Sequence, residues 1–173
     1  VGYLAATSGS SSGGGSNGES KKIMSFSPSG NEEIENVGTN VGDVAPNFAS
    51  EEENFSLRGH RGEVVILDFM ATWCPGCKEE IKHLKEVRSS FSTENVSIIS
   101  VLVSPRESKN EISEFKEDQN MNWIVGKSPE VGLNYGVNSI PTIYILNKDG
   151  EIHYRNVGVV GSSTLKSKIG EVL

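Results

Sequence analysis

The chain has 173 residues, a formal net charge of -7, and a hydrophobic fraction of 35%. This length fits one domain with an additional segment. An acidic chain without a basic stripe is a poor candidate for binding nucleic acid or an anionic membrane surface, because both attract clustered Lys and Arg.

The first forty residues differ in composition from the rest, and we predict a flexible tail over 1–40 followed by a folded domain over 41–173. Residues 8–20 are almost entirely Gly and Ser, which is typical of a flexible linker. Residues 21–40 are polar without clear periodicity, so we expect no regular structure there. Residues 1–7 are mildly apolar, and they fit either the stub of a removed membrane anchor or an ordinary N-terminus.

From Val41 onward, strand and helix patterns alternate. Apolar runs rich in β-branched residues predict buried strands, helical spacing predicts amphipathic helices, and Asn147-Lys148-Asp149-Gly150 predicts a hairpin loop. The predicted strands are 55–57, 64–71, 96–103, 122–125, 142–146 and 151–160, and the predicted helices are 75–91, 109–119, 129–135 and 162–173. This order predicts an α/β fold with a mixed central sheet flanked by helices.

The two cysteines of the chain stand three positions apart in Trp73-Cys74-Pro75-Gly76-Cys77. They follow a predicted buried strand and begin a predicted helix. Two sulfurs at this spacing can close a disulfide in the first helical turn. Cys74 lies where unpaired backbone N–H groups favour a thiolate, so it is the predicted nucleophile and Cys77 the resolving residue. Pro75 suits the first helical position because it needs no N–H there.

Other uses of the two cysteines are less well supported. A disulfide framework needs more cysteines. A structural zinc site needs about four ligands, and the three histidines show no paired spacing. We therefore expect a redox pair, with neither a metal nor another cofactor.

Four segments together resemble the TlpA/ResA-type thioredoxin-like thiol-disulfide oxidoreductases of the AhpC/TSA-redoxin superfamily. The active-site segment 64–80 and the loop 135–142 are the specific matches, and 41–48 and 145–152 resemble the entry segment and last hairpin of that family. The resemblance implies a thioredoxin-like fold over 41–173 and exchange of dithiol and disulfide with protein substrates and a redox partner protein.

The resemblance also implies roles for individual residues. It implies that the Ile140–Pro141 bond is cis and faces the cysteines, that Trp73 packs beside the disulfide, and that Trp73, Pro75 and Ile140 contact the substrate. The alternative for Pro141 is a trans proline that begins a strand, and for Trp73 it is simple core filling.

Three acidic residues near the motif are candidates for a role in the redox chemistry: Asp68 for proton transfer, and Glu79 and Glu80 for redox tuning. Asp68 stands six positions before Cys74, where thioredoxins carry a buried acid. A carboxylate in this apolar strand is costly unless its pKa rises, and such an acid can exchange protons with Cys77. The alternative is an Asp that reaches solvent at a strand end. Glu79 and Glu80 follow the motif where the family often has an acid, but exposed glutamates are ordinary in a first helix, which is the interpretation preferred here.

The sequence leaves two rival functions open. A peroxiredoxin fits the entry segment, yet Ala71 and Asp68 stand where that class has Thr or Ser and Pro. A Sco-like copper carrier fits soft thiolate ligands, with His153 as the distant ligand, but it needs one more residue between the cysteines. The linker and the resemblance further predict a monomeric domain outside the cytoplasm, membrane-anchored or secreted, whose full-length gene product carries an apolar segment before Val1.

Overall fold

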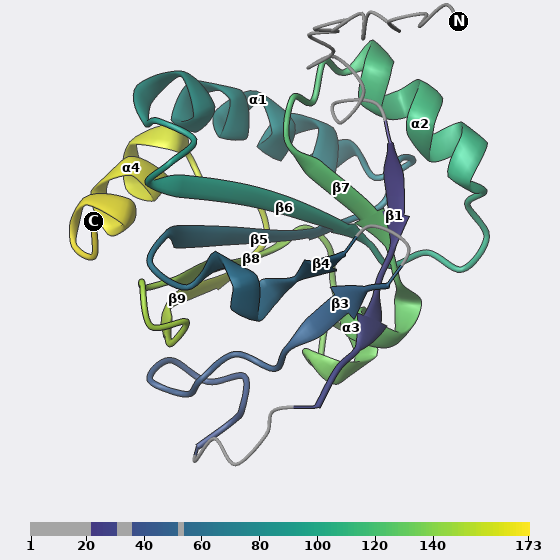
Figure 1. Ribbon diagram of the computed structural model, residues 1–173. Coiled ribbons are helices and arrows are strands. Elements are labelled where there is room, and N and C mark those ends of the chain that lie inside the picture. The colour runs from purple at the N-terminus through teal and green to yellow at the C-terminus, as the bar shows by residue number, and fades with distance from the viewer. Residues whose placement is uncertain (1–21, 31–35, 52–53) are drawn as a thin grey trace, which may run out of the picture.

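A computed structural model describes residues 22–30, 36–51 and 54–173 (Figure 1). A six-stranded sheet forms its centre, in the order β1-β7-β6-β5-β8-β9. Its first four strands are parallel to one another, β8 is antiparallel to β5, and β9 is antiparallel to β8. The strands are β1 Ile23–Ser25, β5 Val64–Met70, β6 Val96–Leu102, β7 Ile124–Lys127, β8 Thr142–Leu146 and β9 Ile152–Val157.

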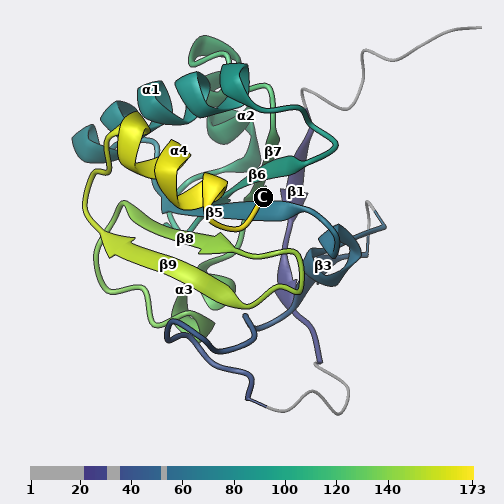
Figure 2. The same ribbon diagram turned by 90° about the vertical axis from the view of Figure 1, so that its left-hand side faces the viewer.

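Helices and a small second sheet cover the two faces of the central sheet, as Figures 1 and 2 show. One face packs against α1 Pro75–Ser90, α2 Lys109–Asp118 and α4 Ser162–Gly170. The other face packs against α3 Pro129–Asn134, the 3-10 helix η1 Leu57–His60 and the sheet β2-β3-β4, formed by Ser27–Pro28, Phe48–Ser50 and Phe55–Ser56. The predicted α/β fold with a mixed central sheet is confirmed.

The central strand β5 is buried along its whole length. Because successive side chains of a strand point to opposite faces, Ile66, Asp68 and Met70 share one face. Ile66 and Met70 pack in the core on the α1 side, whereas Val65, Leu67 and Phe69 pack in the core on the α3 side. Asp68 therefore faces the helix that begins with the cysteine motif.

The N-terminal boundary of the folded part differs from the prediction. The segment 21–40 was expected to lack structure, but Ile23–Ser25 pairs with β7 and Phe26 is buried. A Cβ on Gly126 would lie 2.3 Å from a ring atom of Phe26, so the absence of a side chain at this position makes room for the ring. The predicted Gly/Ser linker and apolar N-terminal segment lie outside the described residues.

Other boundaries differ by a few residues. The returning strand β9 ends at Val157, because Gly158 has a φ of 97° and breaks the extended backbone. The predicted strand at 55–57 is shorter and continues as η1, and the predicted strand at 122–125 is found at Ile124–Lys127. The closing helix ends at Gly170 instead of Leu173.

Candidate active site

The cysteine pair lies between the end of β5 and the start of α1. Cys74 is the N-cap of α1, Pro75 follows at the first helical positions, and a disulfide joins Cys74 to Cys77 across a Cα–Cα distance of 5.2 Å. The sulfur of Cys74 accepts a hydrogen bond from the backbone N–H of Cys77 at 3.1 Å. Unpaired N–H groups and the positive end of the helix dipole meet at this position, and both favour a negative charge on Cys74 after reduction.

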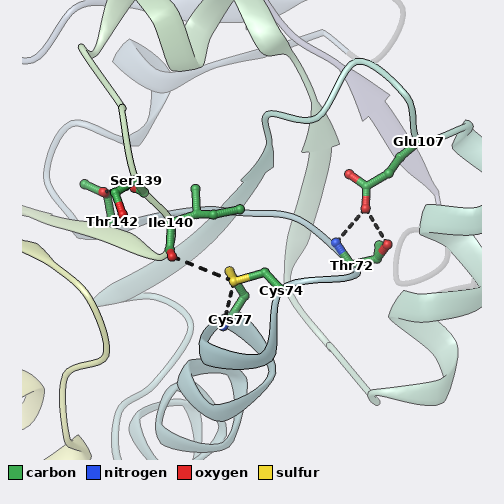
Figure 3. Close-up of a disulfide and its surroundings, with 7 residues drawn as sticks. All are labelled: Thr72, Cys74, Cys77, Glu107, Ser139, Ile140 and Thr142. Carbon is green, nitrogen blue, oxygen red and sulfur yellow. Dashed lines mark hydrogen bonds between the residues drawn. A yellow bond between two sulfur atoms is a disulfide. The ribbon is translucent and has the colours of Figure 1, made fainter.

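The loop before β8 lies against the motif. The Ile140–Pro141 peptide bond is cis, as expected. The carbonyl oxygen of Ile140 lies 3.8 Å from the sulfur of Cys74 (Figure 3). A Cβ on Gly76 would lie 3.3 Å from Cδ of Pro141, so the absence of a side chain in the middle of the motif lets the helix start approach this proline.

Asp68 is fully buried on the α1 side of the sheet. It pairs in register with Ser100 of β6, whose hydroxyl donates to Asp68 Oδ2 at 2.8 Å. The indole N–H of Trp123 in turn donates to the Ser100 hydroxyl at 3.0 Å. Asp68 Oδ1 has no hydrogen-bond partner among the described residues. Burial raises the pKa of Asp68 to about 7, and the Ser100 hydrogen bond opposes this rise.

Glu80 is also fully buried, and the prediction that it is an exposed helix residue is wrong. It lies one turn after Cys77 on the inner face of α1. Its Oε2 accepts a hydrogen bond from the backbone N–H of Val160 at 2.7 Å. Burial raises its pKa to about 7; the Val160 hydrogen bond lowers it, and the charge of Asp68 raises it. Two buried acids thus lie close enough together for the charge of Asp68 to raise the pKa of Glu80, where the sequence predicted one buried acid. Glu79, the neighbour of Glu80 in the sequence, is exposed.

The other predicted substrate contacts lie around the disulfide. Trp73 is 63% exposed, so simple core filling is wrong for this residue. Pro75 is exposed and Ile140 is partly buried. A groove of about 480 Å³ runs beside the motif and is lined by Ala71, Trp73 and the segments 103–106 and 137–140. An exposed aromatic ring beside an open groove is suited to contact a bound polypeptide.

The structure places the histidine of the copper-carrier hypothesis beside an acidic side chain. Among the residues that the structure describes, no group of three or more His, Cys, Asp and Glu side chains is arranged to hold a metal ion. His153, the ligand required by the copper-carrier hypothesis, lies 2.7 Å from the carboxylate of Glu171.

A thioredoxin-like fold that carries a Cys-Pro-Gly-Cys disulfide at a helix N-terminus, beside a cis proline, defines a thiol-disulfide oxidoreductase. The family model described as "AhpC/TSA family" matches residues 41–155, and the chain belongs to this family.

Known proteins of similar sequence agree with this class, and a solved structure shares the fold. The chain is 26% identical over 137 residues to the thioredoxin-like protein YneN of Bacillus subtilis, covering 77% of this chain and 81% of that protein. It is 26% identical over 143 residues to the thiol-disulfide oxidoreductase ResA of Geobacillus thermodenitrificans, covering 80% and 81%. The crystal structure of a putative thiol:disulfide interchange protein DsbE from Chlorobium tepidum superposes with a TM-score of 0.69 at 21% identity, covering 78% of this chain and 99% of that one. The chain is a thiol-disulfide oxidoreductase with a CXXC redox site.

Proposed function

We propose that Cys74 attacks disulfides of substrate proteins and that Cys77 resolves the resulting mixed disulfide. The main support for this proposal is the position of Cys74. Its sulfur accepts a hydrogen bond from the backbone N–H of Cys77 at the start of α1, and Cys74 is 5% exposed whereas Cys77 is 1% exposed. The Cys74 thiolate forms a bond to one substrate sulfur and releases the other as a thiolate. The Cys77 thiolate then attacks the Cys74 sulfur, which forms the intramolecular disulfide and releases the second substrate thiol.

The buried carboxylates supply the proton acceptor that this second step needs. Cys77 loses its proton before it attacks. The buried acids on α1 and on the sheet face that packs against α1 are Glu80 and Asp68, each with a pKa raised to about 7 by burial. An acid with a pKa near the working pH can both accept and return a proton. Asp68 and Glu80 are therefore the proposed proton acceptors for Cys77 in the exchange reaction.

The surface around the disulfide supplies the substrate contacts. Trp73 and Pro75 are exposed next to Cys74, and Ile140, which precedes the cis Pro141, lines the same groove as Trp73. Their apolar surfaces support binding of a polypeptide segment that flanks the substrate disulfide. Pro141 keeps the loop against the motif, since its ring lies beside Gly76.

The domain acts as a monomer outside the cytoplasm, tethered or secreted, and serves a redox partner protein. The Gly/Ser composition of residues 8–20 supports a tether. In the described part of the chain, no helix has the length and apolar character needed to span a membrane. Fractionation of cells that express the full-length gene product tests this placement, and recovery of the product in the cytoplasmic fraction would refute it.

The reduction of insulin with dithiothreitol as electron source tests the proposed activity. The wild-type protein should accelerate the reaction, and Cys74→Ser should abolish the acceleration. Retention of the activity by Cys74→Ser would refute the assignment of Cys74 as the attacking residue.

A further inference from the structure

Glu107 is a buried carboxylate outside the cysteine motif, and the exchange chemistry described above does not use it. It is 5% exposed and lies between β6 and α2. Because β5 and β6 are parallel, the residues that follow their carboxyl ends meet at one edge of the sheet. This arrangement brings Glu107 to Thr72, which is 35 positions away in the sequence.

Thr72 gives Glu107 two hydrogen bonds. Its backbone N–H donates to Glu107 Oε1 at 2.6 Å, and its hydroxyl donates to the same oxygen (Figure 3). Glu107 Oε2 has no hydrogen-bond partner among the described residues. A buried carboxylate carries a desolvation cost, so these two donors are needed to offset it.

The backbone around Glu107 is fixed from the opposite side as well. The ammonium group of Lys127, at the end of β7, donates to the carbonyl oxygens of Glu107 and Pro105, the latter at 3.2 Å. Lys127 thus binds the backbone of the loop 103–107, and Thr72 binds the side chain of Glu107 in the same loop.

Both partners of this contact adjoin the groove beside the disulfide. Thr72 stands between Ala71 and Trp73, which line the groove, and Glu107 follows directly on the lining segment 103–106. The contact between Thr72 and Glu107 therefore joins two segments that line the groove, and it ties the end of the loop 103–106 to the residue that precedes Trp73. A loop that moves away would leave the groove without the part of its lining that residues 103–106 supply.

We propose that Glu107 is a positioning residue for substrate binding, which holds the loop 103–106 and Trp73 in place so that the groove accepts an extended segment of the substrate protein next to its disulfide. The proposal rests on the exchange of disulfides with protein substrates. In this role Glu107 does not act on the sulfur atoms. It affects the affinity for a polypeptide, and the reactivity of the Cys74–Cys77 pair toward a small disulfide is independent of it.

The test compares a protein substrate with a small one. Kinetics with insulin report on the groove, and the second-order rate of the reduced protein with the small aromatic disulfide DTNB reports on the cysteines alone. For Glu107→Ala we expect an increase of about tenfold in KM for insulin, the size expected when a hydrogen bond to a charged group is lost. The kcat, the rate with DTNB and the reduction potential of the cysteine pair should stay within about twofold of wild type.

Two further variants separate positioning from a general effect on folding. Glu107→Gln keeps an oxygen that accepts from Thr72, so its KM should stay within about threefold of wild type. Thr72→Val removes the hydroxyl and keeps the N–H, so its KM should lie between those of wild type and Glu107→Ala.

Glu63→Ala is the matched control. Glu63 is a partly buried carboxylate that accepts from the hydroxyl of Ser97 at 2.5 Å, but it precedes β5 at the edge of the sheet away from the cysteines. Its loss should leave KM for insulin unchanged.

An unchanged KM in Glu107→Ala, or a rate with DTNB that falls in parallel with the insulin rate, would overturn the proposal. If Glu107→Ala does not fold, a wild-type KM in Thr72→Val would overturn it as well. If the reduced wild-type protein does not react with DTNB, this result would instead contradict the exchange activity itself.

Discussion

Replacing Asp68 by Asn tests whether the buried acid carries the titration that its environment implies. The two side chains have nearly the same shape, and the amide oxygen of Asn can still accept from the hydroxyl of Ser100, which Asp68 contacts at 2.8 Å. The substitution therefore removes the ionisation of the buried group and preserves its packing. In the oxidised protein the effect is isolated from the thiols, since both cysteines are in the disulfide.

The sign of the effect follows from the direction of the pKa change. Burial raises the pKa of Asp68 from 3.8 to about 7 in the folded protein. Below pH 3.8 the group is protonated in both states, and its ionisation costs the fold nothing. Between these two values the unfolded chain ionises while the folded protein keeps its proton, so the free energy of unfolding falls as the pH rises. At 1.36 kcal/mol per pKa unit, the full change amounts to at most about 4 kcal/mol.

Urea unfolding of the oxidised protein between pH 4 and pH 8, followed by tryptophan fluorescence, measures this quantity. The free energy of unfolding of Asp68→Asn, relative to wild type, should rise with pH by an amount up to about 4 kcal/mol and level off above pH 7. Asp118→Asn, at an exposed position at the end of α2, is the matched control for the replacement of Asp by Asn, and an equal trend in this variant would show that burial is not the cause. Parallel pH profiles for wild type and Asp68→Asn would refute the raised pKa.

Three further predictions concern the site and the fold. Alkylation of the reduced protein near neutral pH should label Cys74 before Cys77, as peptide mass spectrometry of a brief reaction will show; preferential labelling of Cys77 would reverse their proposed roles. Glu80→Gln should also gain stability relative to wild type with rising pH, but Glu80→Gln combined with Asp68→Asn should gain less than the sum of the single variants, because the charge of Asp68 raises the pKa of Glu80; strict additivity in urea unfolding at pH 8 would contradict this coupling. Gly126→Ala should lower the free energy of unfolding by about 1 to 3 kcal/mol, because its Cβ overlaps the Phe26 ring; an unchanged urea midpoint would contradict the close contact.

Local sequence patterns were sufficient to predict the central strands and the helix that carries the motif. The apolar run of β5 and the helical spacing after Cys77 depend only on neighbouring residues, and both elements are found within one residue of their predicted ends. The strand β1 was missed because three residues carry no periodicity, and its pairing with β7 spans about a hundred positions.

The functional side chains that belong to the cysteine motif, or to the segments that resemble the family, could be predicted from the sequence. Glu80 was missed because its burial depends on how α1 docks and on a hydrogen bond from Val160, 80 positions away. Its helical spacing was the available signal, since it adjoins the buried Ile81 and lies one turn after Cys77. Glu107 left no local signal, because its role depends on the parallel pairing of β5 with β6.

The central claim is that Cys74 attacks a protein disulfide and Cys77 resolves the intermediate, and trapping the intermediate tests it most directly. Reduced Cys77→Ser protein is incubated with insulin, the reaction is quenched with acid, and the intact mass and the modified peptide are determined under non-reducing conditions. A mixed disulfide between Cys74 and an insulin chain should persist in Cys77→Ser, and no corresponding adduct should form in Cys74→Ser. A stable adduct on Cys77 in the Cys74→Ser protein, with none on Cys74 in Cys77→Ser, would contradict it.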